Sequence, residues 1–223
     1  MSLCCHTFSI AASCPESGRF GVAVATAIPA GGALCPFARP GVGALAIQAW
    51  VNPLLGTRGL ELLEQGLSAE QALKSLLAGD PDGEKRQLAL VDRHGGAAAF
   101  SGSLVDAWKG HLVGEGFALT GNFLTDEEVL QAMARAFEGS EGELSERLLA
   151  ALEAGREAGG DRRNLRSAAL YVVDREEFPY VDLRVDEHRD PLPELRRIFE
   201  IHKDSVLPHY DEIVRSLQTE VQP

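Results

Sequence analysis

The sequence predicts an α+β protein in which helices cover the faces of antiparallel sheet. Strand patterns come in runs separated by paired helices, in the order strands, helices, strands, helices, strands, helix. The strict alternation of strand and helix that marks a parallel, doubly wound sheet is missing. Residues 1–60 contain one acidic residue, Glu16, and three arginines, so we expect this segment to form mostly buried, central strands.

Alternating and β-branched segments predict the first strands. Residues 7–13 (TFSIAAS) and 21–27 (GVAVATA) flank the turn-forming CPESGR, which indicates a hairpin. The stretch PAGGALCPFARPG is expected to be a long loop, and residues 41–50 (GVGALAIQAW) a third, apolar strand. The many Gly and Ala residues leave small side chains that allow another layer to pack closely.

The first helical pair follows, with leucines at helical spacing and a break at Gly66. Ser68 is the expected N-cap of its second helix, which ends at Gly79. Residues 86–92 and 97–102 then predict a second hairpin, and 111–122 a strand region interrupted by glycine.

The second helical pair is expected to begin at an N-cap, Thr125, and to end at Gly159–Gly160. Two further strands are predicted over 167–173 and 180–185. A C-terminal helical arm follows, broken near Pro208.

Length and charge narrow the class of protein. The chain has 223 residues, of which 45% are hydrophobic, and a formal net charge of -12. This length favours one domain, and the negative charge argues against binding to nucleic acid or to an anionic membrane. The four cysteines form no CxxC pair, and no transmembrane segment or signal peptide is apparent, so we expect reduced thiols in the cytoplasm.

Common catalytic and nucleotide-binding motifs are missing, so no cofactor is expected. The segment 181–188 (VDLRVDEH) places Asp182, Arg184, Asp186 and His188 at every second position, on one face of a continuous strand. These residues predict either a metal site or a solvated, ion-paired outer face. We favour the outer face, because three ligands along one strand rarely converge on one ion, and we expect no metal.

Polar residues at element boundaries are the other candidates. Asp161, Arg162 and Arg163 follow two glycines at a helix end, where they could hold a carboxylate or simply complement the helix dipole. Asn122 lies at a glycine-linked corner, where it could act either as an oxyanion donor or as a structural residue. Gln48, in an apolar strand, needs a partner if it is buried.

Seven segments, taken together, resemble the domain-of-unknown-function 1028 family of bacteria and archaea. They are TFSIAAS, ESGRFGVAVATA, PFARPGVGALAIQAW, RQLALVD, TGNFL, GGDRRNLRSAALYV and YVDLRVDEHRDP, in the family's order. The resemblance runs from about Thr7 to about residue 200. It implies a fold of the N-terminal-nucleophile (Ntn) hydrolase type, a four-layer αββα sandwich of two antiparallel sheets between helical layers.

The resemblance gives Thr7 a chemical meaning. In Ntn hydrolases the first residue of the mature chain attacks an amide carbonyl, and its own α-amine acts as general base. Thr7 is the matching residue here, but residues 1–6 precede it and block its amine. We therefore expect residues 1–6 to be a leader or vector-derived, residues 7–200 a single domain, and 201–223 a helical extension.

The resemblance also implies roles for the other candidates. Thr26 would lie beside Thr7 across the hairpin, Asn122 would serve the oxyanion, and Asp161 would orient the site. Gln48, Arg162 and Arg163 would contact substrate. The position after the two arginines, usually Gly in the family, is Asn164 in this chain.

Two functions are consistent with these features. One is an amidohydrolase acting on a small amide or peptide, with Thr7 as nucleophile once residues 1–6 are removed. The other is a non-catalytic module of the same fold that binds a small molecule or a partner protein. Broad sheet and helix faces leave room for a homo-oligomer, although nothing in the sequence fixes that state.

Overall fold

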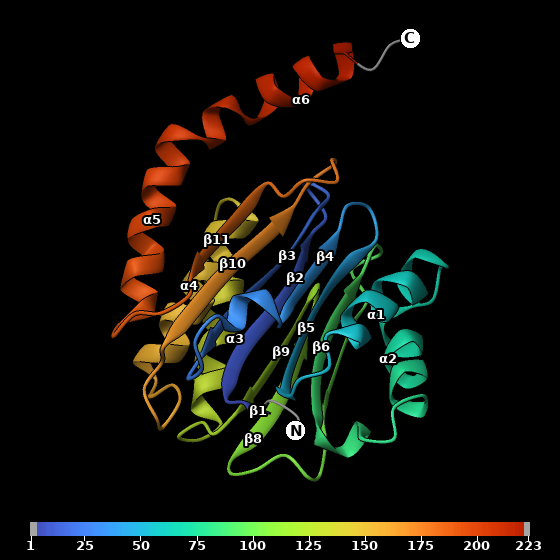
Figure 1. Cartoon of the computed structure of the whole chain (residues 1–223), viewed down its shortest axis with the longest axis vertical. Helices are drawn as coiled ribbons and strands as arrows, with labels where there is room; N and C mark the ends of the chain where they lie inside the picture. Colours follow the sequence, from blue (N-terminus) through green and yellow to red (C-terminus); the bar gives the residue numbers. More distant parts are fainter. Residues whose placement is uncertain (1–3, 221–223) are drawn as a thin grey trace.

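The computed structural model describes residues 4–220 and has two antiparallel sheets between two layers of helices (Figure 1). Helices α1 (Leu54–Glu64) and α2 (Ala69–Ala78) cover the five-stranded sheet. Helices α3 (Glu128–Gly139) and α4 (Leu144–Glu157) cover the six-stranded sheet. This arrangement confirms the predicted αββα sandwich.

The six-stranded sheet has the order β11-β10-β3-β2-β9-β8. Its strands are β2 (Thr7–Cys14), β3 (Arg19–Thr26), β8 (Lys109–Gly114), β9 (Phe117–Asn122), β10 (Ser167–Val173) and β11 (Val181–Val185). Every residue of β2 is buried, because one face of the strand meets the other sheet and the opposite face meets α4. The charge-poor start of the chain is therefore central, as predicted.

The five-stranded sheet is built around β5, which pairs with β6 on one side and with β4 and β1 on the other. Its strands are β1 (Cys4–Cys5), β4 (Pro36–Arg39), β5 (Gly43–Trp50), β6 (Arg86–Asp92) and β7 (Ala97–Ser101). The predicted loop over PAGGALCPFARPG was wrong, because this stretch contains β4 and a 3-10 turn at Gly31–Ala33. Pro36 is tolerated since it begins an edge strand.

The glycine-interrupted strand region predicted over 111–122 is a β8–β9 hairpin that turns at Gly116, whose φ of 72° suits glycine. One other prediction needs correction. Thr125 is not the N-cap of α3, which begins at Glu128. Asp126 Oδ1 accepts from the Glu128 backbone N–H at 2.9 Å instead. Thr125 is held back from the helix because its own N–H donates to the Gly160 carbonyl.

The predicted cap of α2 is confirmed. The Ser68 hydroxyl accepts from the Gln71 backbone N–H, and the Gln71 side chain accepts from the Ser68 N–H. This reciprocal capping box satisfies two donors that the first helical turn leaves unpaired. A further 3-10 turn, Gly83–Lys85, then leads into β6.

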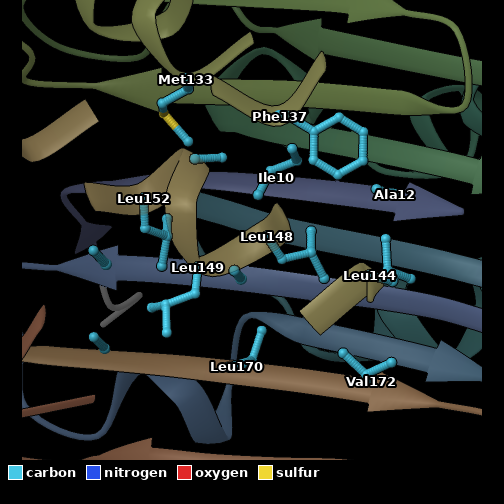
Figure 2. Close-up of a cluster of buried hydrophobic side chains, with 14 of the residues drawn as sticks. Ile10, Ala12, Met133, Phe137, Leu144, Leu148, Leu149, Leu152, Leu170 and Val172 are labelled. Atoms are coloured by element: carbon cyan, nitrogen blue, oxygen red, sulfur yellow. The ribbon is translucent and has the colours of Figure 1, made fainter. Parts of the chain in front are cut away.

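The two interiors differ in side-chain size. Between the six-stranded sheet and its helices lie large apolar groups such as Ile10, Phe137 and Leu148 (Figure 2). Between the two sheets the residues are mostly small, including Ala11 and Ala118. Small side chains let the sheets approach closely, as the composition predicted, so a polar group in this interface must find a protein partner.

The chain ends in α5 (Pro191–Ser205), a 3-10 turn (Leu207–His209) and α6 (Tyr210–Glu220), with the predicted break near Pro208. Helix α5 runs across residue 200 and buries Phe199 against the domain. Helix α6 extends away from the sandwich (Figure 1). Within residues 4–220, no helix combines the length and apolar character needed to span a bilayer.

Candidate active site

A chain of two hydroxyls connects Thr7 to the carbonyl of the residue before it. Thr7 and Thr26 are paired residues of β2 and β3, as the hairpin predicted, and both are fully buried. Thr7 Oγ1 donates to Thr26 Oγ1 at 2.9 Å, and Thr26 Oγ1 donates to the His6 carbonyl oxygen at 2.8 Å. The Ala27 N–H donates to the same oxygen at 3.0 Å. The carbonyl of the His6–Thr7 bond thus has two donors.

A buried polar network joins this pair to the other sheet. Gln48 of β5 donates through Nε2 to the Thr7 carbonyl at 3.0 Å and accepts through Oε1 from Ser9 Oγ at 2.7 Å. Its Nε2 also donates to Gln87 Oε1 at 3.0 Å. Gln48 therefore satisfies the Thr7 backbone carbonyl and fixes the position of Thr7 relative to β5.

Asn122, at the end of β9, belongs to the same network. Its Nδ2 donates to Gln87 Oε1 at 2.7 Å and to the Cys5 carbonyl at 3.3 Å. Its Oδ1 is buried without a hydrogen-bond partner among residues 4–220. The Asn122 amide therefore binds the Cys5 carbonyl, whereas Thr26 and Ala27 bind the carbonyl of the next residue, His6.

Cys5 and His6 are packed into the domain. Cys5 pairs with Ala49 of β5 and is fully buried beside Cys35. The hydrogen bond that the Cys35 thiol donates to Cys5, together with burial, raises the pKa of Cys35 well above its ordinary value, so we expect this thiol to stay protonated.

His6 contacts a residue with a strained backbone. The His6 ring meets the Phe123 ring edge-on, with 3.8 Å between centroids. Phe123 has a φ of 56°, a conformation that costs about 1–3 kcal/mol for a bulky side chain. The neighbouring Asn122 and Leu124 are both buried, which holds Phe123 in this position under His6.

Asp161 lies apart from the Thr7 network, within a surface cleft of about 550 Å³. Its Oδ1 accepts from the Arg163 N–H at 2.8 Å, while Oδ2 is buried without a partner among the described residues. The nearest cation is Arg163 Nε at 3.9 Å, too far for a hydrogen bond. Burial raises the pKa of Asp161 to about 6, against the lowering effect of the Arg163 N–H.

The two neighbouring arginines are exposed and point to different partners. Arg162 donates to the Thr125 carbonyl at 2.9 Å, and the Arg163 guanidinium stacks on Phe123 at 4.6 Å from the ring centroid. Arg163 is thus linked to His6 through one aromatic ring. Asn164, at the position where the resemblance implies glycine, has a φ of 67°, a left-handed conformation that Asn tolerates.

The acidic strand β11 does not gather its side chains into a site. The strand ends at Val185, so Asp186 and His188 lie beyond it. Arg184 pairs with Asp186 at 3.6 Å, and His188 Nδ1 contacts the Asp190 backbone. Over residues 4–220, no group of three or more His, Cys, Asp or Glu side chains is placed to hold a metal ion.

Sequence reasoning missed four polar members of this region: Ser9, Gln87, Thr120 and Ser167. Gln87 was detectable, because it is a glutamine in an apolar strand just as Gln48 is, and the two are register partners. Ser167 lies opposite Thr26 on the neighbouring strand. Ser9 and Thr120 contact each other at 3.1 Å, and neither differs in pattern from an ordinary strand residue.

Replacing Asp161 with asparagine should stabilise the fold at neutral pH. A pKa raised from 3.8 to about 6 means that the folded state loses stability as pH rises through this range. We therefore expect Asp161→Asn to raise the free energy of unfolding by about 2 kcal/mol at pH 7.5, after allowance for solvent screening, and by almost nothing near pH 3.5. Urea unfolding at both pH values checks this. An equal gain in the free energy of unfolding at both pH values, or a loss at pH 7.5, would contradict this expectation.

The fold and the family match define the class of protein. Two antiparallel sheets between helical layers form the αββα sandwich that the resemblance to Ntn hydrolases predicts, with Thr7 at the start of a central strand. A family model described as a family of unknown function (DUF1028) matches residues 7–195, and the chain belongs to this family.

Solved structures give two further comparisons. A protein from Silicibacter pomeroyi, whose crystal structure carries the same family description, is 35% identical with a TM-score of 0.85. The match covers 92% of this chain and 89% of that one. Anbu (ancestral beta-subunit) from Yersinia bercovieri aligns over 97% of this chain and 98% of its own, at 12% identity and a TM-score of 0.38, too low to support any statement. No curated protein was found to match.

Proposed function

We propose that this protein is an Ntn-type amidohydrolase that acts on a small amide or peptide, with Thr7 as nucleophile after the His6–Thr7 bond is cut. The observation that carries the proposal is the hydroxyl chain from Thr7 through Thr26 to the His6 carbonyl oxygen, with the Ala27 N–H on the same oxygen. Donors aimed at a carbonyl oxygen stabilise the negative charge that develops there during attack.

We propose that the cut uses these two hydroxyls. Thr7 Oγ1 attacks the His6 carbonyl carbon, and its proton passes to Thr26 while the Thr26 proton moves to the His6 oxygen. The His6–Thr7 C–N bond then breaks, the proton passes to the Thr7 nitrogen, and an ester joins His6 to Thr7 Oγ1. Water hydrolyses this ester, which leaves a His6 carboxylate, the free Thr7 hydroxyl and a free α-amine.

Removal of residues 1–6 supports the second stage. Thr7 is fully buried, Cys5 pairs with Ala49 of β5, and His6 packs on Phe123. Their departure frees the edge of β5 at Ala49–Trp50 and the Asn122 amide that had donated to Cys5. A substrate acyl group can then enter, and the Thr7 amine, with an ordinary pKa of about 8, serves as general base.

Hydrolysis by a chain that begins at Thr7 tests the proposal. The chain is released from a fusion so that Thr7 is its first residue, and is given acetyl-Ala-Ala-His p-nitroanilide, whose acyl side imitates two small residues before His6. We expect release of p-nitroaniline, rising with pH through about 8. Thr7→Ser should retain activity.

Two control variants are prepared and assayed in the same way. Thr7→Ala removes the nucleophile, and one glycine placed before Thr7 blocks the amine without altering the side chain. Both should lose activity by at least about 100-fold. Equal rates for the parent and Thr7→Ala chains, on this substrate or on any amide that the protein cleaves, would sink the proposal.

A further inference from the structure

We propose that the space filled by Cys5 and His6 is a peptide-binding slot, open once the leader (residues 1–6) is cut off and leaves. It takes an extended peptide with a neutral aromatic side chain in the first position before the cut bond and a small side chain in the second. His6 marks the first position and Cys5 the second, because the cut falls between His6 and Thr7. This inference rests on the function proposed above and names its substrate class.

The main chain of the leader is held by contacts that any extended peptide can make. Cys5 pairs with Ala49 on the edge of β5, and its carbonyl accepts from Asn122 Nδ2 at 3.3 Å. The His6 carbonyl has two donors of its own. Strand β4 pairs with the same edge of β5 over Gly43–Ala46 and stops short of Ala49. Departure of the leader therefore leaves an open strand edge that another peptide can pair with.

The second position is a closed, apolar pocket. Cys5 has no exposed surface, and its side chain belongs to a cluster with Val24, Cys35 and Ala169, all buried. Val24 lies on β3 and Ala169 on β10, so the six-stranded sheet forms one wall of the pocket. A side chain larger than that of cysteine would have to displace these residues, and such overpacking is unfavourable. We therefore expect alanine, serine or cysteine in this position, and not leucine.

The first position has an aromatic wall. The His6 ring meets the Phe123 ring edge-on, with 3.8 Å between centroids. Its Nδ1 is buried without a hydrogen-bond partner among residues 4–220. A buried, unpaired polar atom lowers a binding constant by about tenfold or more. A phenyl ring keeps the aromatic contact and has no such atom, so a peptide with phenylalanine here should displace the cut leader.

The melting temperature of the full-length chain tests both positions without any chemistry. Thr7→Ala keeps the leader attached, and further substitutions are made in that chain. We expect His6→Phe to raise the melting temperature by about 2 °C or more, because it removes the unpaired nitrogen. Cys5→Leu should lower it by about 2 °C or more through overpacking. His94→Phe, at an exposed histidine, is the control and should not raise it.

Calorimetric titration tests the open slot directly. The protein is the chain that begins at residue 7, with Thr7→Ala so that no peptide is cleaved. The probes, at pH 8, are acetyl-Ala-Phe amide, acetyl-Ala-His amide and acetyl-Leu-Phe amide. We expect acetyl-Ala-Phe amide to bind at least about tenfold more tightly than either of the others, since each of those fails in one position.

A change in the wall of the second position should change its selectivity. In the same chain, Cys35→Ala enlarges the pocket, so acetyl-Val-Phe amide should gain at least about fivefold in affinity relative to acetyl-Ala-Phe amide. Cys14→Ala removes an equally small, buried thiol at the far end of β2 and is the matched control. It should leave this ratio unchanged.

The outcomes separate the slot from the hydrolase. Peptides that bind in the expected order, without turnover by a chain that begins at Thr7, support the slot and overturn only the hydrolase. Cleavage of acetyl-Ala-Phe and acetyl-Leu-Phe p-nitroanilides at equal kcat/KM overturns the slot and leaves the hydrolase standing. Equal binding of the three amides, or a melting temperature that falls with His6→Phe, also overturns the slot.

Discussion

Replacing Thr26 with valine is expected to slow the cleavage of the His6–Thr7 bond by about 100-fold or more. Valine keeps the size and branching of threonine but removes both the acceptor for Thr7 Oγ1 and one of the two donors to the His6 oxygen. Loss of one oxyanion donor alone commonly costs a factor of about 100 to 1,000. Intact mass against incubation time gives the rate.

A matched control separates chemistry from folding in this experiment. Thr120 is also a fully buried threonine of the six-stranded sheet, but its hydroxyl contacts Ser9 and not His6. Thr120→Val should therefore cleave within about threefold of the parent, although it too loses a buried hydrogen bond. Equal slowing in both variants would mean that the effect is structural, and an unchanged rate in Thr26→Val would exclude the proposed proton path.

Replacing Gln87 with leucine is expected to lower the free energy of unfolding by about 4 kcal/mol. Gln87 is fully buried between the sheets, where Nε2 donates to Ser101 Oγ and to the Gly121 carbonyl, both at 2.8 Å. Its Oε1 accepts from Gln48 and Asn122. Leucine fills a similar volume but leaves several buried polar atoms without partners, at about 1–3 kcal/mol each.

Urea unfolding measures this loss, and the same substitution at an exposed glutamine is the control. Gln131 lies on the solvent side of α3, so Gln131→Leu should change stability by no more than about 0.5 kcal/mol. Because Gln87 holds Gln48, which in turn holds the Thr7 carbonyl, the Gln87→Leu chain should also cleave more slowly wherever it still folds. A loss in stability below about 1 kcal/mol would show that the network is not coupled as described.

Much of the fold could be predicted from the sequence because its signals are local. The alternating pattern and the scarcity of charged residues predicted the central strands, and Ser68 marked the start of α2, whose cap is made by contacts within one turn. The structure of PAGGALCPFARPG could not be read in this way. Strand β4 exists because its backbone pairs with β5, and glycines and prolines conceal that pairing in the sequence.

The residues of the candidate site were likewise predicted only where a local signal fixes their position. Thr26 could be placed opposite Thr7 because a tight hairpin fixes the register of its two strands. The separation of Asp161 from Thr7 could not be predicted, since it depends on how the turn after α4 meets Phe123 and Leu124. The resemblance set Asp161 and Asn122 in one site, and the structure shows two environments joined through Phe123 and His6.

The mass of the full-length chain, followed during incubation near pH 8, tests the central claim most directly. Our account predicts loss of residues 1–6, N-terminal sequencing that begins at Thr7, and no such loss in Thr7→Ala. A parent chain that remains folded and keeps His6 attached to Thr7 would contradict self-cleavage by the Thr7–Thr26 pair.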